Sequence, residues 1–67
     1  MEKVQLIING KPSRFTCDRE MLELAKIYIS EGRHLLDIVR EFTASGFERI
    51  LAMAIVANAS RQINSRE

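Results

Sequence analysis

The chain is predicted to fold as an α+β domain, in which an N-terminal β-hairpin is followed by two α-helices, and to form a homodimer. An Asn-Gly pair between two strand-like runs predicts the hairpin, and long stretches with helical periodicity follow it. The second helical stretch is apolar on every side from Ile50 to Ala57, so it must be covered all round. A chain of 67 residues buries too little surface to be comfortably stable alone. We therefore expect a second copy to supply the missing cover.

The hairpin is expected over about residues 3–17. The apolar, β-branched run Val4–Ile8 stops at Asn9-Gly10, and a strand-like pattern resumes at 14–17. Asn-Gly between two such runs is the strongest short-range hairpin signal. With Asn9 and Gly10 as the two turn residues, the expected pairs are Ile8 with Lys11, Ile7 with Pro12, Leu6 with Ser13, Gln5 with Arg14 and Val4 with Phe15.

This register also predicts the two faces and the two edges of the hairpin. Side chains alternate across a strand, so one face is expected against the helices and the other toward solvent. Because Pro12 has no N–H to donate, the second strand is expected at a sheet edge, and the first strand has a free edge to offer a partner. The face expected against the helices holds Val4, Leu6, Ile8 and Phe15.

The first helix is expected over about residues 18–43, with Asp18 at its N-cap. Its apolar positions step alternately by four and three residues, which is typical of an amphipathic helix. Gly32 lies on this stripe at a cost of roughly 1 kcal/mol relative to alanine, so it marks either the close approach of another backbone or a kink. The stripe consists of Met21, Ala25, Tyr28, Gly32, Leu35, Val39 and Phe42.

The second helix is expected over about residues 46–64. Ser45 followed three residues later by Glu48 has the form of a capping box at its start. After Val56 the helix becomes more polar. The residues expected in the core or at the dimer interface are Leu6, Ile8, Phe15, Tyr28, Leu35, Phe47, Ile50, Met53, Ala54 and Ala57.

Composition and charge exclude several classes of protein. The whole chain, 1–67, is expected to be one domain, since 46% apolar and 28% charged residues are ordinary globular values. The net charge is only +1, and positive and negative residues are interspersed along the chain. This pattern argues against a phosphate-binding surface and a nucleic-acid partner. No uncharged apolar segment is long enough for a membrane span, and the N-terminus lacks the features of a signal peptide. We therefore expect a cytoplasmic protein without a membrane partner.

The sequence offers little for catalysis or metal binding. His34 and Cys17 supply at most two of the three or four ligands that zinc needs. We interpret His34 as a helix-surface or interface residue and Cys17 as a small buried hydrophobe. A Gly-rich phosphate loop, a serine elbow and a metal motif are all missing from the sequence. We therefore expect no enzyme activity, no catalytic residue, no cofactor, no metal and no small-molecule substrate.

A strand followed by two helices is also the outline of a ribbon-helix-helix repressor. Such proteins read the major groove with polar or basic strand residues. The strand Val4–Ile8 is almost wholly apolar, and the first helix is too long for that fold. These features argue against DNA binding, which stays an alternative hypothesis.

Four segments carry a family likeness: Ile8-Asn9-Gly10-Lys11, Phe15-Thr16-Cys17, the helix start with Glu20 and Leu24-Ala25, and above all the Glu-Arg-x-x-x-Met-Ala-x-x-x-Asn run from Glu48 to Asn58. Together they resemble the ZapA family of bacterial cell-division proteins, which associate with the tubulin-like protein FtsZ. In that family the hairpin and helices form a dimeric head, and the last helix continues into a coiled coil that joins dimers into tetramers. This chain reaches only to Glu67, which puts the coiled coil and the tetramer in doubt.

The resemblance implies a non-enzymatic accessory protein that binds FtsZ filaments and promotes their lateral association in the division ring. It implies partner contacts at Lys11 and Glu48. Arg14 and Arg49 join them because they are exposed-type residues beside those positions. Two alternatives stay open: a small dimeric adaptor, for example a phage protein, with a different partner, and the DNA-binding reading above.

Overall fold

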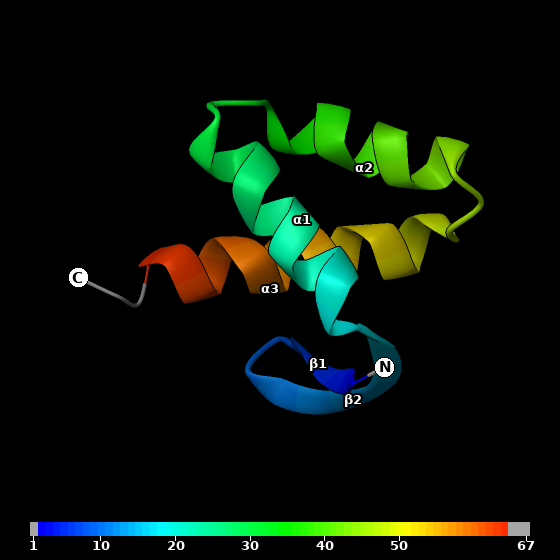
Figure 1. Ribbon diagram of the computed structural model, residues 1–67. Helices are drawn as coiled ribbons and strands as arrows, with labels where there is room; N and C mark the ends of the chain where they lie inside the picture. The colour runs from blue at the N-terminus through cyan, green and yellow to red at the C-terminus, as the bar shows by residue number, and fades with distance from the viewer. Residues whose placement is uncertain (1, 65–67) are drawn as a thin grey trace.

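The structure is a computed structural model that describes residues 2–64, and it confirms the α+β class (Figure 1). A two-stranded antiparallel sheet is followed by three helices, where the sequence predicted two. The last helix lies across the molecule and contacts the other two helices and the first strand. The elements are β1 (Lys3–Ile8), β2 (Lys11–Asp18), α1 (Arg19–Ser30), α2 (Leu35–Ala44) and α3 (Arg49–Asn64).

The hairpin turn forms as the Asn-Gly signal predicts. Asn9 and Gly10 have φ angles of 54° and 78°, and positive values at both central residues are those of a type I′ turn. The pairs next to the turn, Ile8 with Lys11 and Ile7 with Pro12, are confirmed.

Farther from the turn the predicted register is wrong. The ladder shifts between Gln5 and Ile7, and at this point the Ser13 hydroxyl donates to the Leu6 carbonyl at 2.7 Å and accepts the Phe15 N–H at 3.2 Å. The predicted pairs Gln5 with Arg14 and Val4 with Phe15 are replaced by Gln5 with Thr16 and Val4 with Cys17.

The register shift moves the pairing by two residues, so it keeps the same side chains on the inner face. Leu6 is fully buried, as the sequence predicts. Val4, Ile8 and Phe15 are half-buried against the core, and Cys17 is buried beside them. The hairpin therefore covers the helices with the predicted face despite its wrong register.

The helix predicted over 18–43 is two helices, and Gly32 separates them. Its φ of +87° lies in the region that favours glycine, and it follows the last turn of α1. The Gly32 N–H donates to the Ile29 carbonyl at 3.0 Å and the Arg33 N–H to the Tyr28 carbonyl at 3.3 Å, which is the Schellman pattern of a helix end. A Cβ at Gly32 would meet no atom within 4 Å, so the close approach considered from the sequence is wrong.

Arg33 holds α2 against the end of α1. Its guanidinium forms ion pairs with Glu41 at 2.6 Å and with Glu31 at 3.4 Å. The guanidinium carbon also lies 4.3 Å from the centre of the Tyr28 ring, within the range of a cation–π contact. Beyond this point α2 folds back over α3 instead of continuing the direction of α1 (Figure 1).

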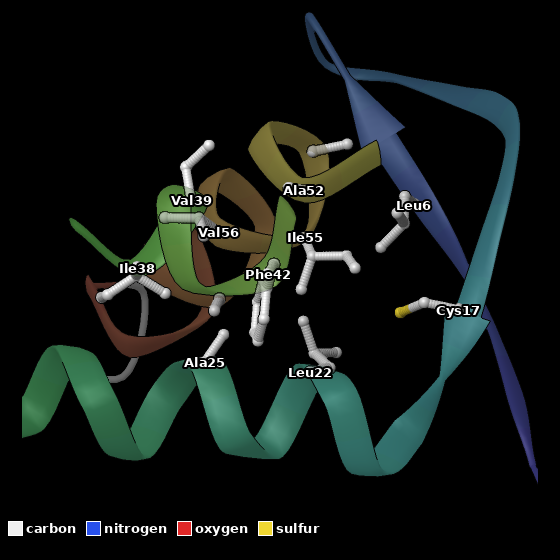
Figure 2. Close-up of a cluster of buried hydrophobic side chains, with 12 residues drawn as sticks. Leu6, Cys17, Leu22, Ala25, Ile38, Val39, Phe42, Ala52, Ile55 and Val56 are labelled. Atoms are coloured by element: carbon white, nitrogen blue, oxygen red, sulfur yellow. The ribbon is translucent and has the colours of Figure 1, made fainter. Parts of the chain in front are cut away.

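The core forms where α1, α2 and β1 meet α3 (Figure 2). α3 contributes several alanines to it, and such small side chains let neighbouring elements approach its backbone closely. Of the predicted core residues, Leu6 and Ala54 are buried, while Ile8, Phe15, Tyr28 and Phe47 are half-buried against the cluster. The buried hydrophobic residues are Leu6, Cys17, Leu22, Ala25, Ile38, Val39, Phe42, Ala52, Ala54, Ile55, Val56 and Ala59.

Candidate functional site

One face of α3 is left uncovered. Ile50 and Met53 are 61% and 49% exposed, and Ala57 is exposed beside them. Their spacing of three and four residues places them along one side of the helix, and we call them the α3 strip. The sequence predicted them in the core or at a dimer interface; within one chain they are not core residues. Leu35, predicted with them, is also exposed, at 44% on the first turn of α2.

A groove of about 400 Å³ runs between the α3 strip and β1. Ile7, which is 38% exposed, stands on the strand side of it. Its lining is mainly apolar and includes no carboxylate, while one cation, Arg61, reaches it from the last turns of α3. The lining residues are Ile7, Ile8, Asn9, Ile50, Met53, Ala54, Ala57 and Arg61.

Asn58 links α3 to β1, the two elements that line this groove, through hydrogen bonds to Ile7. It is a buried polar residue, 6% exposed, on α3. Its Oδ1 accepts the Ile7 N–H at 2.9 Å, and its Nδ2 donates to the Ile7 carbonyl at 2.9 Å and to the Ala54 carbonyl at 2.7 Å. The side-chain amide thus bonds the backbone of Ile7 as a neighbouring strand would. The outer edge of β1, which was predicted to be free, is therefore closed at Ile7.

Sequence reasoning gave Asn58 no structural or functional role. The available signal was a polar amide between Ala57 and Ala59, inside an otherwise apolar stretch. A buried amide needs hydrogen-bond partners, which predicts a backbone contact but not its place. The partner, Ile7, lies 51 positions away in the chain.

The four predicted partner-binding residues are all exposed, but they come from two parts of the molecule. Lys11 and Arg14 lie on β2, and the Arg14 guanidinium is 5.8 Å from the centre of the Phe15 ring. Glu48 and Arg49 lie where α3 begins. Within residues 2–64, none of the four forms an ion pair. Their charges are therefore available to a partner.

Arg49 has a neighbour that the sequence did not predict. It lines a hollow of about 310 Å³ between α2 and α3 together with Arg40, Leu36, Val39 and Thr43. The two arginines bring like charges to one hollow, and neither has a carboxylate partner in the described part of the chain. This hollow favours an anionic group over a cationic one.

The capping box predicted from Ser45 and Glu48 does not form. The Ser45 hydroxyl donates to the Glu41 carbonyl at 3.1 Å, so it closes the end of α2 rather than the start of α3. Glu48 precedes α3, and its backbone carbonyl accepts the Ala52 N–H at 2.8 Å. The reason is that α3 begins at Arg49 and not at about residue 46, which moves the cap position to Glu48 itself. Its carboxylate is then left for a partner.

His34 is the N-cap residue of α2, and Cys17 is buried in the core. The His34 carbonyl accepts the N–H groups of Asp37 and Ile38 at the start of α2. Burial raises the pKa of the Cys17 thiol, and the charge of Asp18 raises it further. Among residues 2–64 there is no group of three or more His, Cys, Asp or Glu side chains placed to hold a metal ion.

In a search of the described helices, none has the length and apolar character needed to cross a membrane. In comparisons with protein families, curated proteins and solved structures, the chain matched none. None of these comparisons supports the likeness to ZapA, which depends on the motif residues alone.

Proposed function

We propose that this protein is a non-enzymatic interaction module that forms a homodimer through the α3 strip and binds a larger partner through its charged residues. The observation that carries the proposal is the exposure of Ile50 and Met53, at 61% and 49%, on a helix whose other sides are buried. Exposed apolar side chains that lie next to one another form the kind of patch that interaction sites use. In a two-fold symmetric dimer the α3 strip of one chain packs against the α3 strip of the other, so both chains use the same surface.

FtsZ filaments are the partner we propose, on the strength of the run from Glu48 to Asn58. Lys11, Arg14 and Arg49 support a contact with an acidic protein surface, because they form no ion pair within residues 2–64. A dimer presents two equal sets of these charges. Two sets let one dimer bind two filaments at once, which would promote their lateral association in a cytoplasmic division ring.

Co-sedimentation with FtsZ polymerised in GTP tests this proposal, with a reaction lacking GTP as the control. The protein is expected in the pellet only with filaments. Lys11→Glu and Arg14→Glu should each lower the pelleted fraction several-fold while the dimer mass is unchanged. Lys26→Glu is the matched variant, since Lys26 lies on α1 and already pairs with Glu23 at 3.1 Å. Unchanged pelleting of both Lys11→Glu and Arg14→Glu would count against these contacts.

A folded dimer that stays in the supernatant would contradict the FtsZ assignment but not the dimeric module. The adaptor reading would then stand, with another partner for the same charged residues. A folded monomer at every concentration would contradict the self-association itself. Measuring the solution mass beside each pelleting reaction separates these outcomes.

A further inference from the structure

The hollow between α2 and α3 is built from one face of α2 and the first residue of α3. Its α2 residues follow one another at spacings of three, one and three positions, which places them on the same side of that helix. Arg49 begins α3 and lines the hollow from the other helix. We call this site the arginine hollow, because it holds Arg40 and Arg49; the other residues that line it are Leu36, Val39 and Thr43.

The two guanidinium groups are the donors that this hollow offers to a ligand. Arg40 and Arg49 are exposed, and neither forms an ion pair within residues 2–64. The Thr43 hydroxyl already donates to the Arg40 carbonyl at 2.9 Å. The carboxylate of Glu41 pairs with Arg33 at 2.6 Å, so it does not neutralise the hollow. A guanidinium group matches the shape of a carboxylate or phosphate group and binds it through two parallel hydrogen bonds.

The carboxylates around the arginine hollow exclude a long polyanion. Glu48 directly precedes Arg49, and Asp37 lies one helical turn before Arg40; both acidic residues are exposed. A nucleic acid carries a phosphate at every nucleotide, so it needs several cations in a row and would be repelled by these flanking charges. The arrangement therefore suits one anionic group and not a chain of them.

The apolar part of the arginine hollow suits an anion that is attached to an apolar group. Leu36 is 61% exposed on α2, and Val39, which belongs to the core, lies in the same lining. Covering Leu36 is favourable only if the ligand brings apolar surface of its own, which an inorganic phosphate does not have. A peptide in which an acidic side chain is followed by an apolar one brings both.

We propose that the arginine hollow binds a carboxylate side chain of a protein partner between Arg40 and Arg49, with the partner's neighbouring apolar side chain packed on Leu36. The inference rests on the proposed function only in taking the partner to be an acidic protein. It adds a second contact, separate from Lys11 and Arg14 on β2, and names the short sequence that this contact recognises.

The first test is an NMR titration of the isotope-labelled chain with the dipeptide N-acetyl-Asp-Leu-amide. We expect saturable amide shifts at the residues of the hollow, with a dissociation constant in the millimolar range. Arg40→Gln and Arg49→Gln should each raise that constant at least five-fold, because each removes one guanidinium group. Arg61→Gln is the matched variant, since Arg61 is also an exposed arginine of α3 but lies outside the hollow, and it should change the constant less than two-fold.

The amide spectrum of each variant shows in the same experiment that it is folded. An equal effect of Arg61→Gln, or no saturable shift with the wild-type chain, would overturn the site.

Two further ligands separate the carboxylate from other sources of binding. N-acetyl-Asn-Leu-amide has the same shape without the charge and should bind at least five-fold more weakly. Sodium phosphate should also bind at least five-fold more weakly, because it cannot cover Leu36. Equal binding of the asparagine dipeptide would overturn the role of the arginines, and equal binding of phosphate would overturn the peptide as the occupant.

The second test concerns the apolar half of the hollow. The wild-type chain should bind N-acetyl-Asp-Leu-amide at least two-fold more tightly than N-acetyl-Asp-Gly-amide, and Leu36→Ala should abolish this preference. Leu35→Ala is the matched variant, because Leu35 is 44% exposed on the same helical turn but does not line the hollow, and it should keep the preference. A preference that persists in Leu36→Ala would overturn the apolar contact.

The arginine hollow and the proposed function fail in different ways. The dipeptide titration contains no FtsZ, so a lack of saturable binding overturns the hollow whatever the pelleting experiment gives. A chain that binds the dipeptide through Arg40 and Arg49 but does not pellet with filaments would overturn the FtsZ assignment and leave the hollow with another acidic partner.

Discussion

The two faces of α3 carry similar apolar residues, but one face is buried in the core and the other is exposed to solvent. Ile55, on the inner face, is fully buried among α1, α2 and β1, whereas Ile50, five positions earlier, is 61% exposed. The residue type is the same, so the difference is set by which neighbours the chain itself supplies. A substitution on the inner face should cost the fold, and one on the outer face should cost only the assembly.

The largest expected effect follows from a charge on the inner face. Ile55→Asp should leave the chain unfolded, because an unpaired buried charge costs at least about 3–5 kcal/mol, close to the whole stability of so small a domain. Loss of the helical circular-dichroism signal at 25 °C measures it. Ile55→Val is the matched variant and should stay folded, at a cost of about 0.5–1.5 kcal/mol. A well-folded Ile55→Asp protein would contradict the assignment of the inner face.

The same charge on the outer face should separate assembly from folding. Met53→Asp is expected to keep the helical signal and to reduce the solution mass to that of one chain, 7.7 kDa. The reason is that residue 53 is exposed in the single chain, whereas in the proposed dimer its charge would be buried without an opposite charge beside it. Light scattering coupled to size-exclusion chromatography gives the mass. If the dimer mass is retained, the α3 strip is not the interface.

A smaller effect on stability is expected from substitutions of Gly32, the residue at which α1 ends and the chain turns toward α2. Gly32→Ala should lower the free energy of unfolding by about 1–2 kcal/mol, because alanine is strained at a φ of +87°. Gly32→Asn should cost less, since asparagine tolerates this conformation better. Urea denaturation measures both. An increase in stability with alanine would instead show that α1 and α2 form one continuous helix in solution.

The smallest expected effect concerns Cys17 under the hairpin. Its pKa is raised, mainly by burial, so the folded state holds the neutral thiol. The resulting stabilisation is fully present below the ordinary thiol pKa of 9.0 and is lost as pH rises through the raised value. At pH 8, iodoacetamide should label the native thiol at least ten-fold more slowly than the thiol of the guanidinium-unfolded chain, as mass spectrometry will show. Equal labelling rates for the native and the unfolded chain would mean that the hairpin does not bury Cys17.

Local patterns predicted much of this fold correctly. Asn9-Gly10 predicted the turn, strand alternation predicted the buried Leu6, and the apolar run predicted a helix with an uncovered side. Each of these depends on residues that are close in sequence. The helix break at Gly32 was missed because apolar positions at 28 and 35 keep the helical spacing across it, although Leu35 is exposed and α2 turns back over α3.

Contacts between distant residues decided the rest. Asn58 closes the edge of β1 at Ile7 across 51 positions, and the strand register shifts where the Ser13 hydroxyl binds the Leu6 carbonyl of the facing strand. The amino-acid sequence by itself determined the α+β class, the hairpin and its turn, and a last helix that is apolar on most sides. Only the tertiary structure decided which face of α3 remains open, because that choice depends on where the hairpin and α2 come to lie against it.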